Sequence, residues 1–339
     1  MRTIKEIEQL LVTPSQDLIN EVKKIEGDII ILGISGKIGY NLSALLMNSL
    51  EEAGINKKVY GAARFSSGLE ERQKFEDLGI KTLVCDFLKE EDLAQLPQVE
   101  NVIYMVGYKF GSTGNEPYSW AVNSYVPGRI ASIYKNSRIV AFSTGCVYPL
   151  VKVTKGAPNE DYPLDPVGEY AQSCLGRERI FEYFSRENAT PIVIFRLNYA
   201  IDVHYGVLLE ILQSVMQEEP IDLAMGSVNV IWQPDVSEMA IRSLLHVESP
   251  AKVLNITGPE TLSVRWIAEH FGKLVNKEVA FLNEESDTAL LSNAAMSHKL
   301  FGYPKTSVHE MMDILVEWVT QGGEILDKPT HFQEREGKY

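Results

Sequence analysis

The sequence has 339 residues, of which 45% are hydrophobic and 23% are charged, so it can bury a large core in one large domain or in two. Its net charge of −14 argues against a nucleic-acid partner, because nucleic-acid phosphates would be repelled. No apolar run reaches the roughly 20 residues of a membrane span, and the first residues lack a signal-peptide core. Cys85, Cys146 and Cys174 show no paired or metal-ligand spacing. We therefore expect a cytoplasmic protein with reduced thiols and no metal or membrane partner.

Residues 1–26 are predicted to form an N-terminal extension of two short helices. The segment TPSQ precedes the second helix. Thr13 can cap this helix, Pro14 suits its first position, and Gln16 can bond back to the cap. The sequence does not indicate what the extension is for.

Residues 27–200 alternate between short apolar strands and amphipathic helices. The predicted strands are DIIILG, KKVYGAARF, KTLVCD, NVIYMVG, RIVAFST and PIVIFRL, and the predicted helices cover roughly 37–53, 68–79, 124–136 and 168–187. This alternation predicts an α/β fold with a doubly wound parallel sheet, a Rossmann domain that binds a dinucleotide. Ligands of such sheets bind at the carboxyl ends of the strands.

Residues 201–330 are predicted to form mainly a smaller substrate-binding lobe, with segments that return to the sheet. A helix is expected at about 207–218, a capping box at Asp235–Glu238, a strand at KVLNITG, and a late helix opened by Ser307 and Glu310. The polar tail after Gly323 is expected to lie over the surface.

A glycine-rich loop, GISGKIG, follows the first strand and opens the first helix of the sheet. Its glycines permit a tight turn and let backbone N–H groups approach a pyrophosphate at the helix N-terminus. An ordinary glycine-rich turn is the alternative, but the strand before and the helix after favour a dinucleotide site. The predicted cofactor contacts are Gly33, Ser35, Gly36, Lys37, Ile38, Gly39, Arg64, Asp86, Phe87, Val106 and Tyr170.

The end of the second strand favours one nicotinamide cofactor. An NAD site expects an acidic residue there, whereas an arginine accommodates a 2′-phosphate. Ala63 stands at the position of the acid and Arg64 follows it. We therefore predict NADP, with NAD as the alternative, although Arg64 could equally be a solvated surface residue. Asp86 could receive the adenine amino group or cap its own loop.

The chain resembles the extended short-chain dehydrogenase/reductase superfamily, of the NAD(P)-dependent epimerase/dehydratase type, over roughly residues 28–320. The glycine loop, the segment FSTGCVY and the helix start PVGEYAQSC are similar to the family's three signature segments. The resemblance implies a catalytic hydroxyl at Thr144, with Ser143 beside it, and a catalytic tyrosine at Tyr170. It also implies a homodimer, paired through the helices around 126–135 and 168–187.

The sequence departs from the family's Y-x-x-x-K pattern at the lysine, where it has Cys174. A second match, from Tyr148 to Lys152, contains a proline and is not expected on a helix. In the family the lysine binds the nicotinamide ribose and stabilises the tyrosinate. A nearby cation shifts the pKa of such a group by roughly 1–3 units, which a neutral thiol cannot do. Lys109 and Arg177 are the candidates to compensate.

Cys174 has two readings. It could be a nucleophile, but buried thiols are usually inert, so we favour a small residue that fills the space of the lysine. Because residues four apart share a helix face, its side chain should lie beside the phenol of Tyr170.

The substrate is predicted less closely than the cofactor. Nucleotide-sugar members of the family carry an arginine where this sequence has Asn229, so a smaller sugar, a sugar acid or another carbonyl compound is an alternative. Arg196 and Asn198, in FRLNYA, resemble family residues that face substrate. Ser143 and His204 complete the predicted substrate contacts, although a lone histidine is more often structural.

Two functions remain open at this point. The first is an NAD(P)-dependent oxidoreductase or epimerase that acts on a sugar or sugar-like hydroxyl or carbonyl substrate. Thr144 and Tyr170 would then handle the reacting oxygen, and another group would compensate for the lysine. The second is a catalytically lapsed NAD(P)-binding regulator or scaffold. The hydroxyls at 144 and 170 favour the enzyme, and Cys174 favours the lapsed protein.

Overall fold

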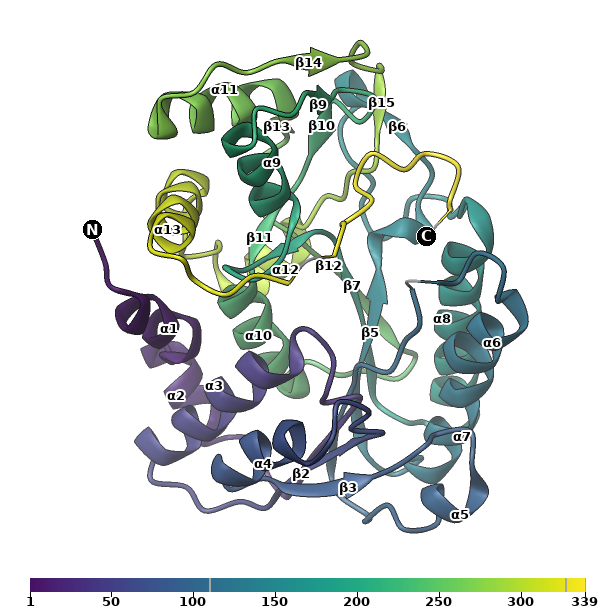
Figure 1. Cartoon of the computed structure of the whole chain (residues 1–339). Coiled ribbons are helices and arrows are strands. Elements are labelled where there is room, and N and C mark those ends of the chain that lie inside the picture. The colour runs from purple at the N-terminus through teal and green to yellow at the C-terminus, as the bar shows by residue number, and fades with distance from the viewer. Residues whose placement is uncertain (110, 327, 339) are drawn as a thin grey trace.

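A seven-stranded parallel sheet forms the centre of the protein (Figure 1), which we describe from a computed structural model of residues 1–109, 111–326 and 328–338. Its strands, in spatial order, are β12 (Lys252–Ile256), β7 (Ile192–Leu197), β5 (Arg138–Thr144), β4 (Asn101–Tyr104), β1 (Ile29–Leu32), β2 (Val59–Ala63) and β3 (Lys81–Val84). Every neighbouring pair is parallel. The strand order reverses between β1 and β4, where a crevice for ligands is expected. The predicted doubly wound α/β fold is confirmed.

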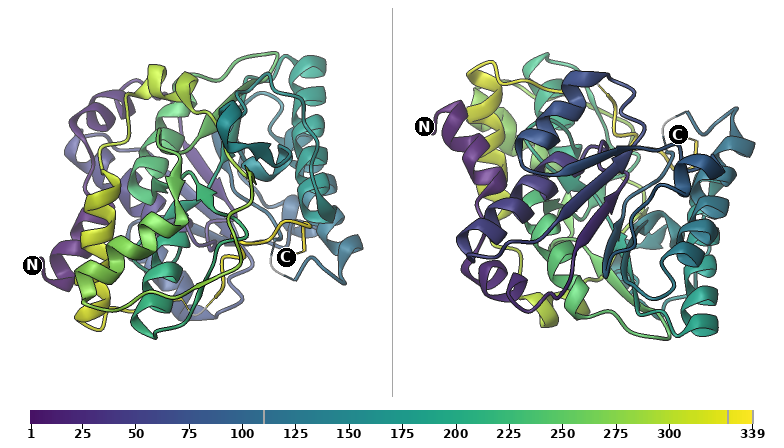
Figure 2. Two further views of the ribbon diagram at one scale, coloured as in Figure 1. Left: turned by 90° about the horizontal axis from the view of Figure 1, so that it is seen from above. Right: turned by 90° about the horizontal axis from the view of Figure 1, so that it is seen from below.

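Helices cover both faces of the sheet, as the two views of Figure 2 show. One face forms a core with α2 (Gln16–Val22), α3 (Gly39–Glu52) and α10 (Gln233–Arg242). The other face forms a core with α7 (Val126–Ile133) and α8 (Gly168–Asn188). Both cores are apolar because the central strands are buried on both sides, which is typical of parallel sheets.

Shorter helices complete the sheet domain. They are α4 (Leu69–Asp77), α5 (Glu90–Leu93), α6 (Glu116–Trp120) and the 3₁₀ turns Gly145–Val147, Val153–Lys155 and Ser243–Leu245. A π-helical turn, Ala121–Tyr125, joins α6 to α7 without a break. Such turns widen a helix locally and often occur at functional sites.

The lobe has an apolar core of its own. It is formed largely by α9 (Val207–Met216), α11 (Val264–Val275) and α13 (Val308–Thr320), and α1 (Ile4–Val12) adds Ile7 and Leu11. The other lobe elements are α12 (Ala295–Phe301) and the strand pairs β6 (Val151–Lys152) with β15 (Thr288–Ala289), β8 (Ala200–Ile201) with β11 (Ile231–Trp232), β9 (Ile221–Asp222) with β14 (Phe281–Leu282), and β10 (Ser227–Val228) with β13 (Leu262–Ser263).

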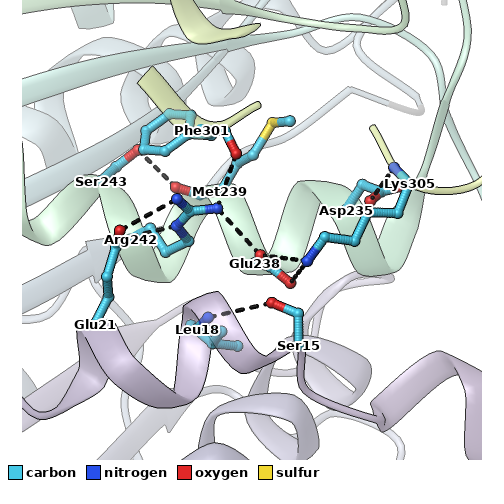
Figure 3. A network of polar contacts seen from close by, with 10 residues as sticks. All are labelled: Ser15, Leu18, Glu21, Asp235, Glu238, Met239, Arg242, Ser243, Phe301 and Lys305. Carbon is cyan, nitrogen blue, oxygen red and sulfur yellow. Dashed lines mark hydrogen bonds and ion pairs between the residues drawn. The ribbon is translucent and has the colours of Figure 1, made fainter. Parts of the chain in front are cut away.

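A polar network joins the second N-terminal helix, α2, to α10 (Figure 3). Arg242 of α10 forms ion pairs with Glu21 of α2, at 2.9 Å, and with Glu238 one turn earlier, at 3.1 Å. Its guanidinium also donates to the carbonyl of Phe301. The extension therefore belongs to the packed body of the protein.

Two local expectations need correction. Ser15, not Thr13, caps α2, because its hydroxyl accepts from the N–H of Leu18 while the Thr13 hydroxyl donates to the preceding helix. Asp235 is not a cap either, since α10 begins two residues earlier and the Asp235 carboxylate accepts from the N–H of Lys305. The cap at Ser307 is confirmed.

The tail after Gly323 does not lie wholly on the surface. Phe332 is 2% exposed and belongs to the apolar core of the lobe, and Thr330 is buried. Figure 1 shows this yellow segment passing β12 and reaching the start of α8. Polar composition predicted exposure, but Phe332 packs into the core of the lobe.

Within residues 1–109, 111–326 and 328–338, no helix is both long and apolar enough to cross a membrane.

Candidate active site

The glycine loop connects β1 to α3 with the close approaches that its sequence predicts. A Cβ on Gly33 would lie 2.9 Å from the backbone of Met105, and one on Gly39 would lie 1.7 Å from the carbonyl oxygen of Ile34. Gly33 also has a φ of +83°. Only glycine fits these positions, and the loop is thereby held against the end of β4.

The start of α3 is suited to an anion. In the part of the chain that the structure describes, no side chain caps this helix, so its first N–H groups remain directed at the loop. The half-buried Lys37 lies there with its amino group 3.2 Å from the centroid of the Tyr205 ring. Burial and the neighbouring Lys109 and Lys328 lower the pKa of Lys37 to about 7, and Asp202 opposes them. These groups fit a pyrophosphate.

The remaining predicted cofactor residues differ in what they contact. Arg64 follows β2, is exposed, and donates to the hydroxyl of Tyr118 at 2.9 Å. Asp86 accepts from the N–H of Leu88 and so caps its own turn, the second of its two readings. Phe87 is buried in the core, 7% exposed, and Val106 is partly buried against it.

Tyr170 and Cys174 are brought together on the first turns of α8. A hydrogen bond joins their side chains. Burial, Cys174 and Cys146 raise the pKa of Tyr170 well above its ordinary value, while Arg177 acts in the opposite direction. Burial likewise raises the pKa of Cys174, which is 0% exposed. At neutral pH the pair is therefore a phenol beside a thiol, and neither group is charged.

Two cations lie near this pair. The amino group of Lys109 is 5.8 Å from the centroid of the Tyr170 ring. Arg177, two helical turns after Tyr170, is 6% exposed and donates to the Phe142 carbonyl at 2.9 Å and to Asn123 Oδ1 at 2.7 Å. Both of these acceptors are neutral, so the charge of Arg177 is not cancelled by either hydrogen bond.

The π-helical turn supplies the partner that sequence reasoning missed. Asn123 accepts from Arg177 and from the N–H of Tyr108, and it donates to the hydroxyl of Ser173 at 3.0 Å. It thereby fixes the guanidinium between the loop after β4 and α8. A Cβ on Gly107 would come within 3.0 Å of that guanidinium. No local signal at Asn123 announces this role, because the pairing is made in three dimensions.

A second buried group lies beneath the end of β5. Ser143 donates to Glu178 at 2.5 Å, and Glu178 forms a buried ion pair with Arg196 at 2.7 Å. Arg196 also donates to the hydroxyl of Tyr148 at 2.7 Å. Glu178 was missed, although it stands four residues after Cys174 on the same helix face. Tyr148, of the second Y-x-x-x-K match, is thus part of this buried network, while Lys152 is exposed and pairs with Asp287.

Thr144 and Asn198 lie on neighbouring strand ends. The Thr144 hydroxyl accepts from the N–H of Cys146 at 3.1 Å and closes the turn after β5. A Cβ on the intervening Gly145 would lie 3.1 Å from the hydroxyl oxygen of Ser292 and 3.2 Å from Asn198. Within the described residues, the Asn198 amide nitrogen and the Ser292 hydroxyl have no hydrogen-bond partner. Such buried polar groups suit a polar ligand.

His204 lies elsewhere. It lines a cavity of about 730 Å³ together with Lys37, and neither Thr144 nor Tyr170 lines that cavity. Its ring contacts Trp318 and lies 3.7 Å from Asp202. Burial lowers the pKa of His204, but the hydrogen bond to Asp202 and the negative charges of Asp202, Glu324 and Glu8 together outweigh burial, so the pKa is raised. A substrate role for His204 therefore stays a prediction.

Comparison with known proteins gives one family and a consistent fold. The model of the NAD dependent epimerase/dehydratase family matches residues 29–248. No match to a curated protein sequence was found.

Three solved structures illustrate the likeness. UDP-glucuronic acid 4-epimerase from Bacillus cereus, in complex with UDP-glucuronic acid and NAD, superposes with a TM-score of 0.72 at 18% identity, over 87% of this chain and 99% of that one. The dTDP-glucose 4,6-dehydratase of Streptomyces venezuelae, with NAD bound, gives 0.73 at 15% identity, over 87% and 97%. A short-chain dehydrogenase/reductase superfamily protein from Agrobacterium tumefaciens, with bound NAD, gives 0.71 at 17%, over 86% and 97%. At these identities the likeness shows the fold.

Proposed function

Because this chain belongs to the NAD dependent epimerase/dehydratase family, we propose that it is an enzyme that transfers hydride between a nicotinamide dinucleotide and a sugar or sugar-like hydroxyl or carbonyl substrate. One observation carries the proposal. Tyr170 lies on the first turn of α8, its side chain is hydrogen-bonded to that of Cys174, and Lys109 lies beside its ring. The predicted catalytic hydroxyls of Thr144 and Tyr170 are thus retained in a setting that holds the phenol protonated.

The chain's own residues would divide the work as follows. The glycine loop and the start of α3 bind the pyrophosphate, with Lys37 beside them. Bound NAD(P) supplies the hydride donor or acceptor. Tyr170 donates a hydrogen bond, and in the reducing direction a proton, to the reacting oxygen, while Thr144 orients that oxygen. Asn198 and Ser143 are the proposed substrate contacts.

Arg177 is the proposed substitute for the family's lysine. Its guanidinium lies on the same face of α8 as Tyr170 and lowers the pKa of that phenol, against burial and the two cysteines. Glu178, the nearest carboxylate on the helix, is already paired with Arg196. Cys174 then fills space between the phenol and the guanidinium, and Lys109 adds a second positive charge.

Arg64 supports a preference for NADP over NAD. It stands after β2 where an arginine accommodates a 2′-phosphate, and its hydrogen-bond partner Tyr118 is neutral, so its charge remains available. The three solved structures described above contain NAD, so the proposed preference for NADP rests on Arg64 of this chain and not on those structures.

The chain is also proposed to form a homodimer in the cytoplasm, with residues 27–200 binding the cofactor and 201–330 mainly the substrate. Large aromatic side chains are exposed on and next to the helices proposed to pair: Tyr183 of α8 is 58% exposed, and Tyr125, directly before α7, is 59% exposed. Light scattering at micromolar concentration should give twice the 38.0 kDa of one chain. A mass of one chain would contradict the dimer.

One observation favours a second function, a catalytically lapsed NAD(P)-binding protein. Cys174 is neutral and its hydrogen bond raises the pKa of Tyr170, which weakens any role as a base. Mass spectrometry of the nucleotide and metabolite that remain bound through purification separates the two functions. A bound NAD(P) with a sugar-like metabolite that the protein converts supports the enzyme. Bound NAD(P) that exchanges no hydride with any co-purified metabolite supports the lapsed protein.

A further inference from the structure

The C-terminal segment, residues 330–337, runs from the core of the lobe to the start of α8. Two contacts anchor its start, because Phe332 is buried in the lobe core and the N–H of Thr330 donates to Glu210 at 2.7 Å. Its far end packs against the start of α8. There a Cβ on Gly337 would lie 2.2 Å from the carbonyl oxygen of Val167, and one on Gly168 would lie 2.4 Å from that of Gly337. The two backbones meet where only glycines fit.

Arg335 holds the middle of the segment. Its guanidinium donates to the carbonyl of Ala224 at 3.0 Å, to the carbonyl of Thr288 at 2.9 Å, and to the Thr288 hydroxyl at 2.5 Å. Ala224 follows β9, and Thr288 lies in β15, so one side chain joins two lobe elements to the segment. Hydrogen bonds with a charged donor are stronger than those between neutral groups, so Arg335 anchors the segment.

The segment leaves very little space beside the turn after β5. A cavity of about 20 Å³ remains there. Its walls include Cys146, Tyr148 and Val167 on the sheet side and Glu334, Arg335 and Gly337 on the segment side. That volume holds about one water molecule, whereas pockets for ligands of drug size run to several hundred Å³.

We propose that residues 334–337, with Arg335 as their anchor, form a wall of the substrate cleft and restrict the substrate to a small molecule without a nucleotide. This inference rests on the proposed function, since it concerns the substrate of the same site. Arg335 is a specificity-determining residue in this account. It occupies the acceptors of Ala224 and Thr288, and with its neighbours Glu334 and Gly337 it lines the small cavity next to Cys146.

Cys146 provides a direct measure of whether the wall opens. It is half-buried under the segment, whereas Cys85 is 1% and Cys174 is 0% exposed. A reagent therefore reaches Cys146 more easily than it reaches the other two thiols. N-ethylmaleimide should therefore modify Cys146 slowly in the full chain. Arg335→Ala, or a chain that ends at Gln333, should raise that rate roughly tenfold, which corresponds to about 1.4 kcal/mol of easier opening. The exposed Lys338→Ala is the matched control and should leave the rate unchanged.

Uridine 5′-diphosphate is the second probe. Calorimetry should detect no saturable binding to the full chain below roughly 1 mM and should detect binding to the Arg335→Ala variant or the shortened chain. Binding by the full chain in that range would overturn the proposal, as would a Cys146 rate that is equal in all variants. The shortened chain keeps Thr330 and Phe332. If it fails to fold, Arg335→Ala decides alone. Neither probe involves NAD(P), so a failure of the proposed enzyme would show separately, as loss of cofactor binding.

Discussion

Two buried arginines in this protein have opposite surroundings. Arg242 is paired with the carboxylates of Glu21 and Glu238 (Figure 3). Arg177 donates to the neutral oxygens of Phe142 and Asn123, and its Nε has no partner among the described residues. The first guanidinium is neutralised locally and joins helices. The second keeps an uncompensated charge beside the phenol of Tyr170. Burial of an arginine thus says little about its role until its acceptors are known.

The largest expected effect comes from breaking the paired arginine. Arg242→Met leaves the partly buried carboxylate of Glu21 and the buried carboxylate of Glu238 without their guanidinium partner, and Lys305 pairs with Glu238, so the free energy of unfolding should fall by about 3 kcal/mol. Urea denaturation measures this change. Arg265→Met is the matched control, because Arg265 pairs with Glu285 at the exposed surface, and it should change stability little. Unaltered stability of the Arg242 variant would show that the network does not clamp the extension.

The next largest effect is expected when the phenol hydroxyl of Tyr170, the group on which Arg177 acts, is removed. Tyr170→Phe deletes the hydroxyl. Turnover of the substrate that mass spectrometry identifies should then fall roughly a hundredfold, which corresponds to about 2.7 kcal/mol in the activation free energy. Cofactor binding should change little. Arg242→Met, in contrast, should leave turnover by the folded fraction intact. Full activity of Tyr170→Phe would remove Tyr170 from the reaction.

A third arginine extends the comparison to the surface. Arg64 donates to the hydroxyl of Tyr118, and in the proposal its charge serves the 2′-phosphate. NADP(H) should bind roughly tenfold more tightly than NAD(H), a difference of about 1.4 kcal/mol, and Arg64→Ala should erase that margin. Isothermal calorimetry with both cofactors checks it. Equal affinities in the unmodified protein would exclude the 2′-phosphate site.

The smallest expected effect concerns Cys174. If the thiol only fills space between Tyr170 and Arg177, Cys174→Ala should leave cofactor affinity and turnover within severalfold of the unmodified values. Its raised pKa agrees with an unreactive thiol. Loss of turnover with intact cofactor binding would instead make Cys174 a chemical participant.

Much of the fold could be predicted because its signals are local. The glycine spacing after β1 and the alternation of strand and helix depend on neighbouring residues, and the Ser307 cap lies three residues from the N–H that it accepts. The cap proposed at Asp235 failed because that carboxylate bonds to Lys305, far along the chain. The hydrogen bond between Asn123 and Arg177 was not predicted for the same reason, because it joins residues that are distant in sequence. No pattern in the sequence joins them.

The site was predicted in part for the same physical reason. Tyr170 and Cys174 lie on one helix, so their contact followed from helical spacing alone. The position of the C-terminal segment did not, because Phe332 and Arg335 are held by lobe residues that are distant in sequence.

The protonation of Tyr170 tests the central claim most directly. Carbon-13 NMR of labelled tyrosines, with Tyr170→Phe to assign the signal, reports the charge of this phenol as pH is raised. A phenol is neutral below its pKa, and the pKa of Tyr170 is raised by burial, Cys174 and Cys146, with Arg177 and Lys109 as the neighbouring cations. The signal should therefore report a neutral phenol at every pH up to about 10. Cys174→Lys should lower the midpoint by roughly 1–3 pH units. An ionised Tyr170 near pH 7 in the unmodified protein would contradict the account.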